Sequence, residues 1–145
     1  MKSLLTILTG LILSSFALAD KNTEIQLPEE TFTVKGKLLN VELTDEGGTL
    51  TVSGIAGKYG RVFITYNMKL NPNSTSQGSF SGRGFGIDDD GNREAASRQG
   101  VWKRDGTKVT MLSLDDLTDG TQNLCKSILD LASEEFTMTF YPMDI

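Results

Sequence analysis

The chain has 145 residues, a formal net charge of −5 and no histidine. Its acidic balance argues against nucleic acid as a partner, because such a surface repels phosphates. The absence of histidine excludes nucleophiles activated by an imidazole, His-ligated zinc or copper, and His-based pH switches. Cys125 is alone, so no disulfide forms within the chain. We expect its thiol to be buried as a small apolar group; an intermolecular disulfide is the alternative.

The first 19 residues have the pattern of a secretory signal peptide. Lys2 precedes an apolar run from Leu4 to Phe16, and Ala17-Leu18-Ala19 supplies the small residues of a cleavage site. The run is shorter than the roughly 20 residues that a membrane-spanning helix needs. We therefore predict cleavage after Ala19, no membrane span, and a mature protein that is periplasmic or secreted.

The mature chain is predicted to begin with a flexible arm over residues 20–30, followed by a single β-barrel domain over residues 31–145. Apolar and polar residues alternate from Thr31 onward, and the phase of this alternation slips by one residue at Leu38-Leu39. A slip of one residue indicates a β-bulge inside a long strand, because each strand side chain faces opposite to its neighbours. Two adjoining strands are the alternative.

Two further strands are predicted at Thr49–Ile55 and Arg61–Leu70, with a glycine-rich turn near Lys58 between them. Arg61–Leu70 has the clearest alternation in the chain. One of its faces carries Val62, Ile64, Tyr66, Met68 and Leu70. Residues 71–77 are rich in turn-forming residues and are expected to form a loop.

The stretch Gly78–Thr107 is predicted to hold two long strands around a two-residue Asp90-Gly91 turn. Asp-Gly between extended runs is a strong hairpin signal, since a tight turn needs positive φ angles. This turn places Arg83 directly opposite Arg98, on the same face as Trp102. Like charges in opposition destabilise a strand pair. Either the register differs, therefore, or an anion lies between the two arginines.

The last third of the chain is predicted to add strands at Lys108–Leu114 and Phe136–Phe140, with an acidic turn at Asp115–Gly120. Asn123–Leu131 fits the spacing of a helix and also that of a strand. We favour a strand, because Ala132–Glu135 would then close a hairpin onto Phe136–Phe140.

The chain is therefore expected to be all-β, an antiparallel meander of about eight strands. A closed barrel is favoured over a sandwich, because closure removes exposed strand edges. The motif Gly100-Val101-Trp102 is similar to the G-x-W motif of lipocalins, and the expected architecture resembles the calycin group of ligand-binding barrels. In lipocalins the motif lies on the first strand, so the resemblance covers architecture alone. It implies an internal ligand and assigns no site residue.

Arg83, Arg98, Trp102 and Tyr66 are the candidate ligand-binding residues. In one interpretation the two arginines hold a carboxylate, sulfate or phosphate inside the barrel by forked hydrogen bonds, and Trp102 and Tyr66 form apolar walls. In the other, both arginines are solvated on the outer face and Trp102 belongs to the core.

The acidic segment Asp88–Asn92 does not fit an EF-hand calcium loop, because its sixth position is Arg93 and its twelfth is Gln99. We predict no catalytic residue, no metal site and no cofactor. The expected function is binding of a small anionic or amphipathic ligand inside the barrel, as a monomer or homodimer. A cyclase- or isomerase-like enzyme with a barrel pocket, and a non-catalytic interaction module of the cell envelope, are the alternatives.

Overall fold

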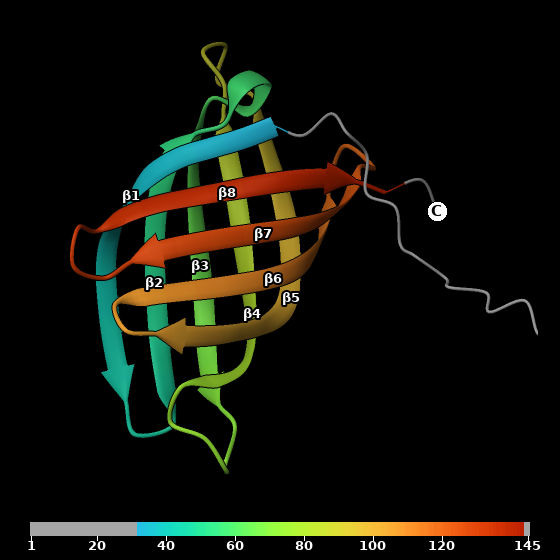
Figure 1. The fold of residues 1–145 in the computed structure, drawn as a ribbon. Coiled ribbons are helices and arrows are strands. Elements are labelled where there is room, and N and C mark those ends of the chain that lie inside the picture. Colours follow the sequence, from blue (N-terminus) through green and yellow to red (C-terminus); the bar gives the residue numbers. More distant parts are fainter. Residues whose placement is uncertain (1–31, 144–145) are drawn as a thin grey trace, which may run out of the picture.

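The computed structural model describes residues 32–143. In chain order they form β1 (Phe32–Thr44), β2 (Gly47–Ile55), the single 3-10 turn η1 (Gly57–Tyr59), β3 (Arg61–Leu70), β4 (Gln77–Ile87), β5 (Arg93–Asp105), β6 (Lys108–Leu117), β7 (Gln122–Asp130) and β8 (Glu135–Pro142). Each strand pairs antiparallel with the next, and β8 pairs with β1 to close a barrel (Figure 1). The predicted fold class is confirmed. The predicted signal peptide 1–19 and arm 20–30 lie outside the described residues.

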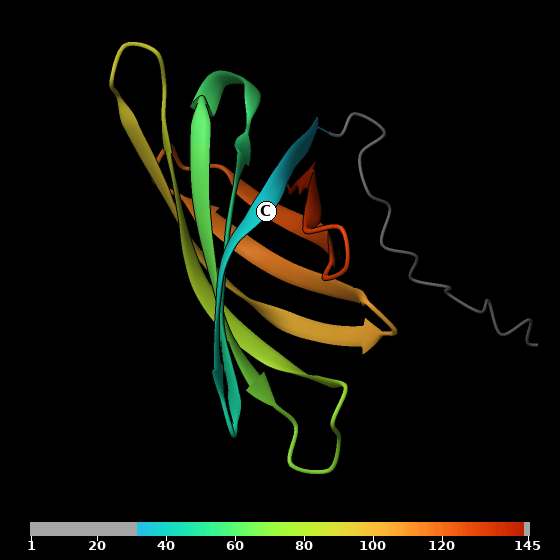
Figure 2. The same cartoon turned by 90° about the vertical axis from the view of Figure 1, so that its left-hand side faces the viewer.

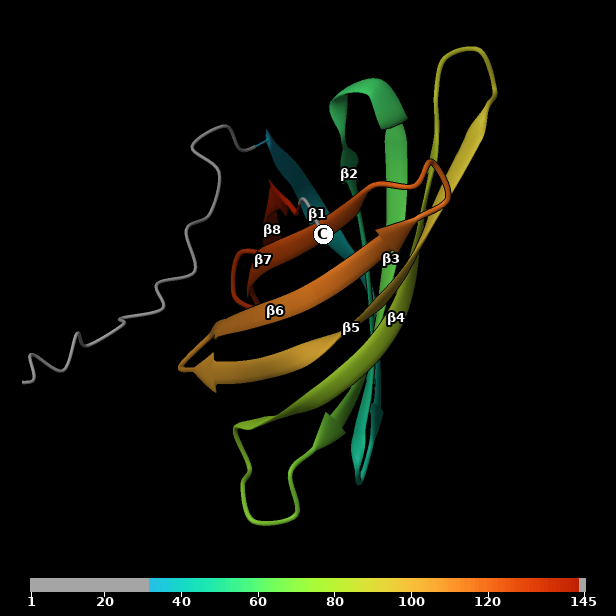
Figure 3. The same cartoon turned by 90° about the vertical axis from the view of Figure 1, so that its right-hand side faces the viewer.

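The bend of β1 sets the shape of the barrel. β1 first runs beside β8 and then turns to run down beside β2 (Figures 1 and 2). The pairing register with β2 shifts between Leu38 and Asn40, which confirms the predicted bulge and gives the local bend that bulges produce. Strands β6–β8 consequently cross the direction of β2–β4 (Figure 3). No helix within residues 32–143 has the length and apolarity to cross a membrane.

Side chains fill most of the interior. The buried apolar core contains Val34, Leu50, Val52, Val62, Ile64, Tyr66, Phe80, Val109, Met111, Leu129, Phe136, Met138 and Phe140. At its centre the ring of Tyr66 lies 5.1 Å from that of Phe80 and 6.2 Å from that of Phe136, measured between centroids. Because the core is made of alternate inward residues of every strand except β5, burial of this apolar surface stabilises the closed barrel as one unit.

The β4–β5 connection differs from the predicted two-residue turn. Ile87 pairs with Arg93, so the connection is the five-residue loop Asp88–Asn92. The Asp88 carboxylate accepts hydrogen bonds from the backbone N–H groups of Asp90, at 3.0 Å, and Asn92, at 2.8 Å. A short polar side chain that binds the backbone ahead of it in this way stabilises a longer loop.

The longer loop moves the register of β4 and β5 by one residue. Arg98 pairs with Gly82 and Arg83 pairs with Ser97, so the predicted opposition of Arg83 and Arg98 is wrong. Successive strand residues face opposite sides of a sheet. Arg98 therefore points into the barrel and is 2% exposed, whereas Arg83 is exposed on the outer face.

The acidic turn predicted at Asp115–Gly120 is wrong at its start. β6 continues to Leu117, and the alternation that begins at Val109 places Asp115 on the inward face, 3% exposed. The ambiguous segment after this turn forms the strand β7, as predicted.

Candidate functional site

An ion pair lies inside the barrel. Arg98 and Asp115 are opposite each other on β5 and β6, and Arg98 Nε donates to Asp115 Oδ2 at 2.7 Å. Ser113 connects the two residues a second time, because its Oγ accepts from Arg98 Nη2 at 3.1 Å and donates to Asp115 Oδ1 at 2.7 Å. A buried ion pair is tolerated only where hydrogen bonds of this kind compensate the loss of water.

Tyr66 contacts the same guanidinium from β3. Its ring centroid lies 4.7 Å from Arg98 Cζ, which is a cation–π distance, and its hydroxyl lies 2.9 Å from Ser127 Oγ. Burial raises the pKa of the Tyr66 phenol, so the hydroxyl stays protonated at neutral pH. The structure thus brings together two of the four predicted site residues, Tyr66 and Arg98.

One nitrogen of the guanidinium remains without a partner. Arg98 Nη1 is buried and makes no hydrogen bond within residues 32–143, while Nε and Nη2 are bonded. An unsatisfied buried donor costs about 1–3 kcal/mol. An acceptor atom that reached Nη1, from water or from a ligand, would recover part of this free energy.

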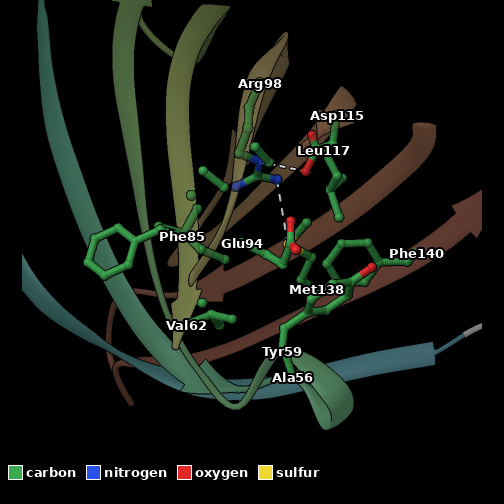
Figure 4. Close-up of a pocket in the computed structure, with 15 residues that line it drawn as sticks. Ala56, Tyr59, Val62, Phe85, Glu94, Arg98, Asp115, Leu117, Met138 and Phe140 are labelled. Carbon is green, nitrogen blue, oxygen red and sulfur yellow. Dashed lines mark hydrogen bonds and ion pairs between the residues drawn. The ribbon is translucent and has the colours of Figure 1, made fainter. Parts of the chain in front are cut away.

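A recess extends from the ion pair to the end of the barrel that carries η1. It is lined by Ala56, Tyr59, Val62, Ile64, Gly84, Phe85, Gly86, Glu94, Ala95, Ala96, Arg98, Asp115, Leu117, Met138 and Phe140. Arg98 and Asp115 lie at one side of this space and Tyr59 and Ala56 at the other (Figure 4). Its volume is about 50 Å³. That is enough for a few waters, and the lining is mainly apolar.

Glu94 is the carboxylate at the rim of the recess. It pairs with Gly86 across β4 and β5 and accepts a hydrogen bond from Thr118 Oγ1. Thr118 Oγ1 in turn accepts from the backbone N–H of Ala95 at 3.0 Å. The half-buried Glu94 side chain is therefore held in place by the β6–β7 turn.

Tyr59 covers the recess and is tied to the same turn. Its hydroxyl donates to Asp119 Oδ2 at 3.0 Å, and Lys58 Nζ lies 3.2 Å from the same oxygen. The pKa of Asp119 is lowered, mainly by the hydrogen bond from the Thr121 hydroxyl and further by those from Tyr59 and Lys58, although its slight burial opposes the change. The connection between β2 and β3 is thus hydrogen-bonded to the β6–β7 turn across the mouth of the recess.

A second hollow lies on the other side of Tyr59. It has a volume of about 340 Å³ and is lined by Phe32, Gly57, Lys58, Tyr59, Thr121, Asn123, Phe140 and Pro142. Tyr59 and Phe140 line both spaces. The inner recess and the larger outer hollow therefore share these two side chains as a common wall.

The other two predicted site residues lie elsewhere. Trp102 is half-buried at the opposite end of the barrel, where its Nε1 donates to the carbonyl oxygens of Lys69, at 3.2 Å, and Ser79, at 3.1 Å. Arg83 is exposed on the outside of β4. Neither lines the recess, so the four residues do not form one site.

Sequence reasoning missed Asp115, Ser113 and Glu94. Asp115 and Ser113 continue the inward alternation of Val109 and Met111, and that pattern was the signal that could have placed them inside. Within residues 32–143 no three His, Cys, Asp or Glu side chains are close enough together to hold a metal ion.

No family model, no curated protein and no solved structure matches this chain.

Proposed function

We propose that this protein binds a small amphipathic ligand inside the barrel, in the recess between Tyr59 and Arg98. The observation that carries the proposal is the unpartnered Nη1 of a fully buried guanidinium in the wall of a mainly apolar recess. A ligand with an apolar body and one acceptor atom would satisfy both features. Recognition by a few polar groups on an apolar lining is typical of small-molecule sites.

The charges around the recess favour an uncharged ligand over an anionic one. The positive charge of Arg98 is already compensated by Asp115 at 2.7 Å. Glu94 adds a negative charge at the rim, which would repel a carboxylate or phosphate. We therefore propose that the ligand is amphipathic and presents a carbonyl or hydroxyl oxygen to Arg98.

The size of the recess requires either a very small ligand or a movement of Tyr59. Ligand sites commonly reach about 300–1,000 Å³, and the recess alone is far smaller. Rotation of Tyr59 away from Asp119 would join the recess to the 340 Å³ hollow outside it. We propose that this movement admits the ligand.

The architecture supports the same proposal. An eight-stranded antiparallel meander closed as a barrel is consistent with a lipocalin-like architecture, in which the ligand lies inside the barrel. We also propose a secreted or periplasmic location, which the predicted signal peptide would give.

A barrel-pocket isomerase or cyclase is the second candidate. It is favoured by one observation, that the carboxylate of Glu94 and the guanidinium of Arg98 line the same recess. Glu94 would act as the base and Arg98 as the group that stabilises negative charge on a carbonyl oxygen.

A non-catalytic interaction module of the cell envelope is the third candidate. It is favoured by the apolar side chains that fill much of the barrel interior and leave little room for a ligand.

Calorimetric titration with matched pairs of small molecules would test the proposal. Each pair has one carbon skeleton, with an amide or ketone in one member and a carboxylate in the other. We expect the uncharged member to bind more tightly and to shift the NMR signals of the Ala95 and Ala96 amides. Gly84→Leu should abolish binding by filling the recess, whereas Arg83→Leu, one position away on the outer face, should not. Absence of binding by every pair, or binding unaffected by Gly84→Leu, would refute it.

A further inference from the structure

The closed barrel leaves one stretch of strand edge open. β1 pairs with β8 only from Phe32 to Lys37, and the Leu38 N–H then donates to the Glu134 carbonyl oxygen at 2.9 Å. The pairing of β1 with β2 continues to Thr44. Among the described residues, therefore, 39–44 have a partner strand on one side only. Figure 1 shows this part of β1 running past the connection between β7 and β8.

The open edge carries exposed apolar side chains. Leu39 is 56% exposed, Val41 is 40% exposed and Leu43 is 81% exposed. The segment contains no Pro, Gly or Lys, and Glu42 is its one charge. Proteins usually protect an edge strand with lysine, proline or a covering element, because unpaired backbone groups are a template for another strand. Within residues 32–143, the bulge at Leu38–Asn40 and the charge of Glu42 are the features that protect this segment.

We propose that this edge pairs with the same edge of a second copy of the chain, as an antiparallel, two-fold symmetric strand pair centred on Val41. Val41 then lies opposite Val41 of the second copy, Asn40 opposite Glu42, and Leu39 opposite Leu43. Apolar residues oppose apolar residues and the glutamate opposes an amide, which are favourable cross-strand pairs. A contact of one surface with itself gives a closed dimer.

The neighbouring registers are less favourable. Centring the pair on Glu42 places two like charges directly opposite each other. Centring it between Val41 and Glu42 places Val41 opposite Glu42 and Asn40 opposite Leu43, which mixes apolar and polar residues. Centring it on Asn40 requires Leu38, whose N–H is already bonded to Glu134. The sequence of the edge therefore selects Val41 as the symmetry point.

Single cysteine substitutions would test the register directly. Val41→Cys places two thiols opposite each other, at the Cα separation of about 4.5–5.5 Å that a disulfide accepts. Under mild oxidation it should give disulfide-linked dimer much faster than Leu43→Cys, which faces position 39. Random collisions would give the reverse order, because Leu43 is the more exposed residue. An equal mixture of Leu39→Cys and Leu43→Cys protein should form the mixed dimer, and wild-type protein, with its buried Cys125, should form none.

Sedimentation velocity would test the association itself, at subunit concentrations from about 10 µM to about 1 mM. Wild-type protein should shift from monomer to dimer over this range. Val41→Lys should remain monomeric, because it places like charges opposite each other across the symmetry axis. Leu112→Lys is the matched control, since Leu112 is 44% exposed on β6, away from the edge. A monomer at every concentration, a dimer unaffected by Val41→Lys, or faster cross-linking at position 43 would overturn the proposal.

Discussion

Arg98 and Asp115 face each other directly across β5 and β6, and their Nε and Oδ2 atoms lie 2.7 Å apart with 1% and 2% of their side chains exposed. Removing either partner leaves a charge without compensation in a buried position. Each residue therefore needs the other to compensate its buried charge.

We expect Asp115→Leu to lower the free energy of unfolding by about 3–5 kcal/mol, the usual cost of breaking a buried ion pair. The double variant Arg98→Met with Asp115→Leu should recover much of this loss, because no unpaired charge remains. Urea denaturation of the wild type, both single variants and the double variant measures the coupling. Lys58→Ala is the control, because it breaks an ion pair with Asp119 in which the lysine side chain is 71% exposed. It should lower the free energy of unfolding by at most about 1 kcal/mol. Additive effects of the two buried substitutions would contradict this prediction.

Two inward glycines of β4 should respond differently to alanine. A Cβ at Gly84 would have its nearest neighbour, Ile64 Cγ1, at 3.6 Å, whereas a Cβ at Gly82 would lie 2.0 Å from the backbone carbonyl oxygen of Thr65. Gly84→Ala should therefore be neutral or stabilise by up to about 1 kcal/mol, through the smaller entropy of the unfolded chain. Gly82→Ala should destabilise by about 1–3 kcal/mol. Thermal and urea unfolding of both variants will show whether the order is as stated; equal effects would contradict it.

The thiol of Cys125 should be protected in the folded protein. It is completely buried on β7, and burial, with a further contribution from the charge of Asp115, raises its pKa well above the usual value. Because the thiolate is the reactive form, we expect Ellman's reagent at pH 8 to label it slowly in buffer and rapidly in denaturant. Rapid labelling of folded protein, or a disulfide-linked dimer of the wild type, would show the prediction wrong.

The hydrogen bond from Tyr59 to Asp119 should stabilise the folded protein to an extent that depends on pH. The pKa of Asp119 is lower in the folded protein than its unfolded value of about 4. Its contribution to stability is therefore present above about pH 4 and is lost as the pH falls further. The stability difference between wild type and Asp119→Asn should be constant from pH 8 to about pH 5 and should shrink below about pH 4. Urea midpoints across this range measure it, with Asp89→Asn, in the exposed β4–β5 loop, as the control.

The strands themselves could be predicted from the sequence, because their signal is local. A half-buried strand shows period-two alternation wherever it lies in the fold, and this identified β3 and β8. A change of phase at Leu38-Leu39 indicated a bulge or two adjoining strands, and the register shift within the single strand β1 confirms the bulge. The glycine and asparagine clusters similarly marked most connections.

Only the tertiary structure decided which arginine lies inside. The segment Asp88–Asn92 is compatible with a two-residue turn and with a five-residue loop, and the two differ by one residue in register. In the folded chain the Asp88 carboxylate binds the backbone of Asn92, and the longer loop follows. That single step turns Arg98 inward and Arg83 outward.

The candidate site also depended on contacts between strands that are distant in sequence. Asp115 looked like part of a turn because its neighbours are acidic, and pairing with β5 shows that its strand continues to Leu117. Arg98, Tyr66 and Asp115 come from three different strands, and Tyr59 reaches Asp119 across the mouth of the barrel. Local patterns determine which residues alternate within a strand. Closure of the barrel determines which of those residues meet, because inward side chains from every strand share one interior.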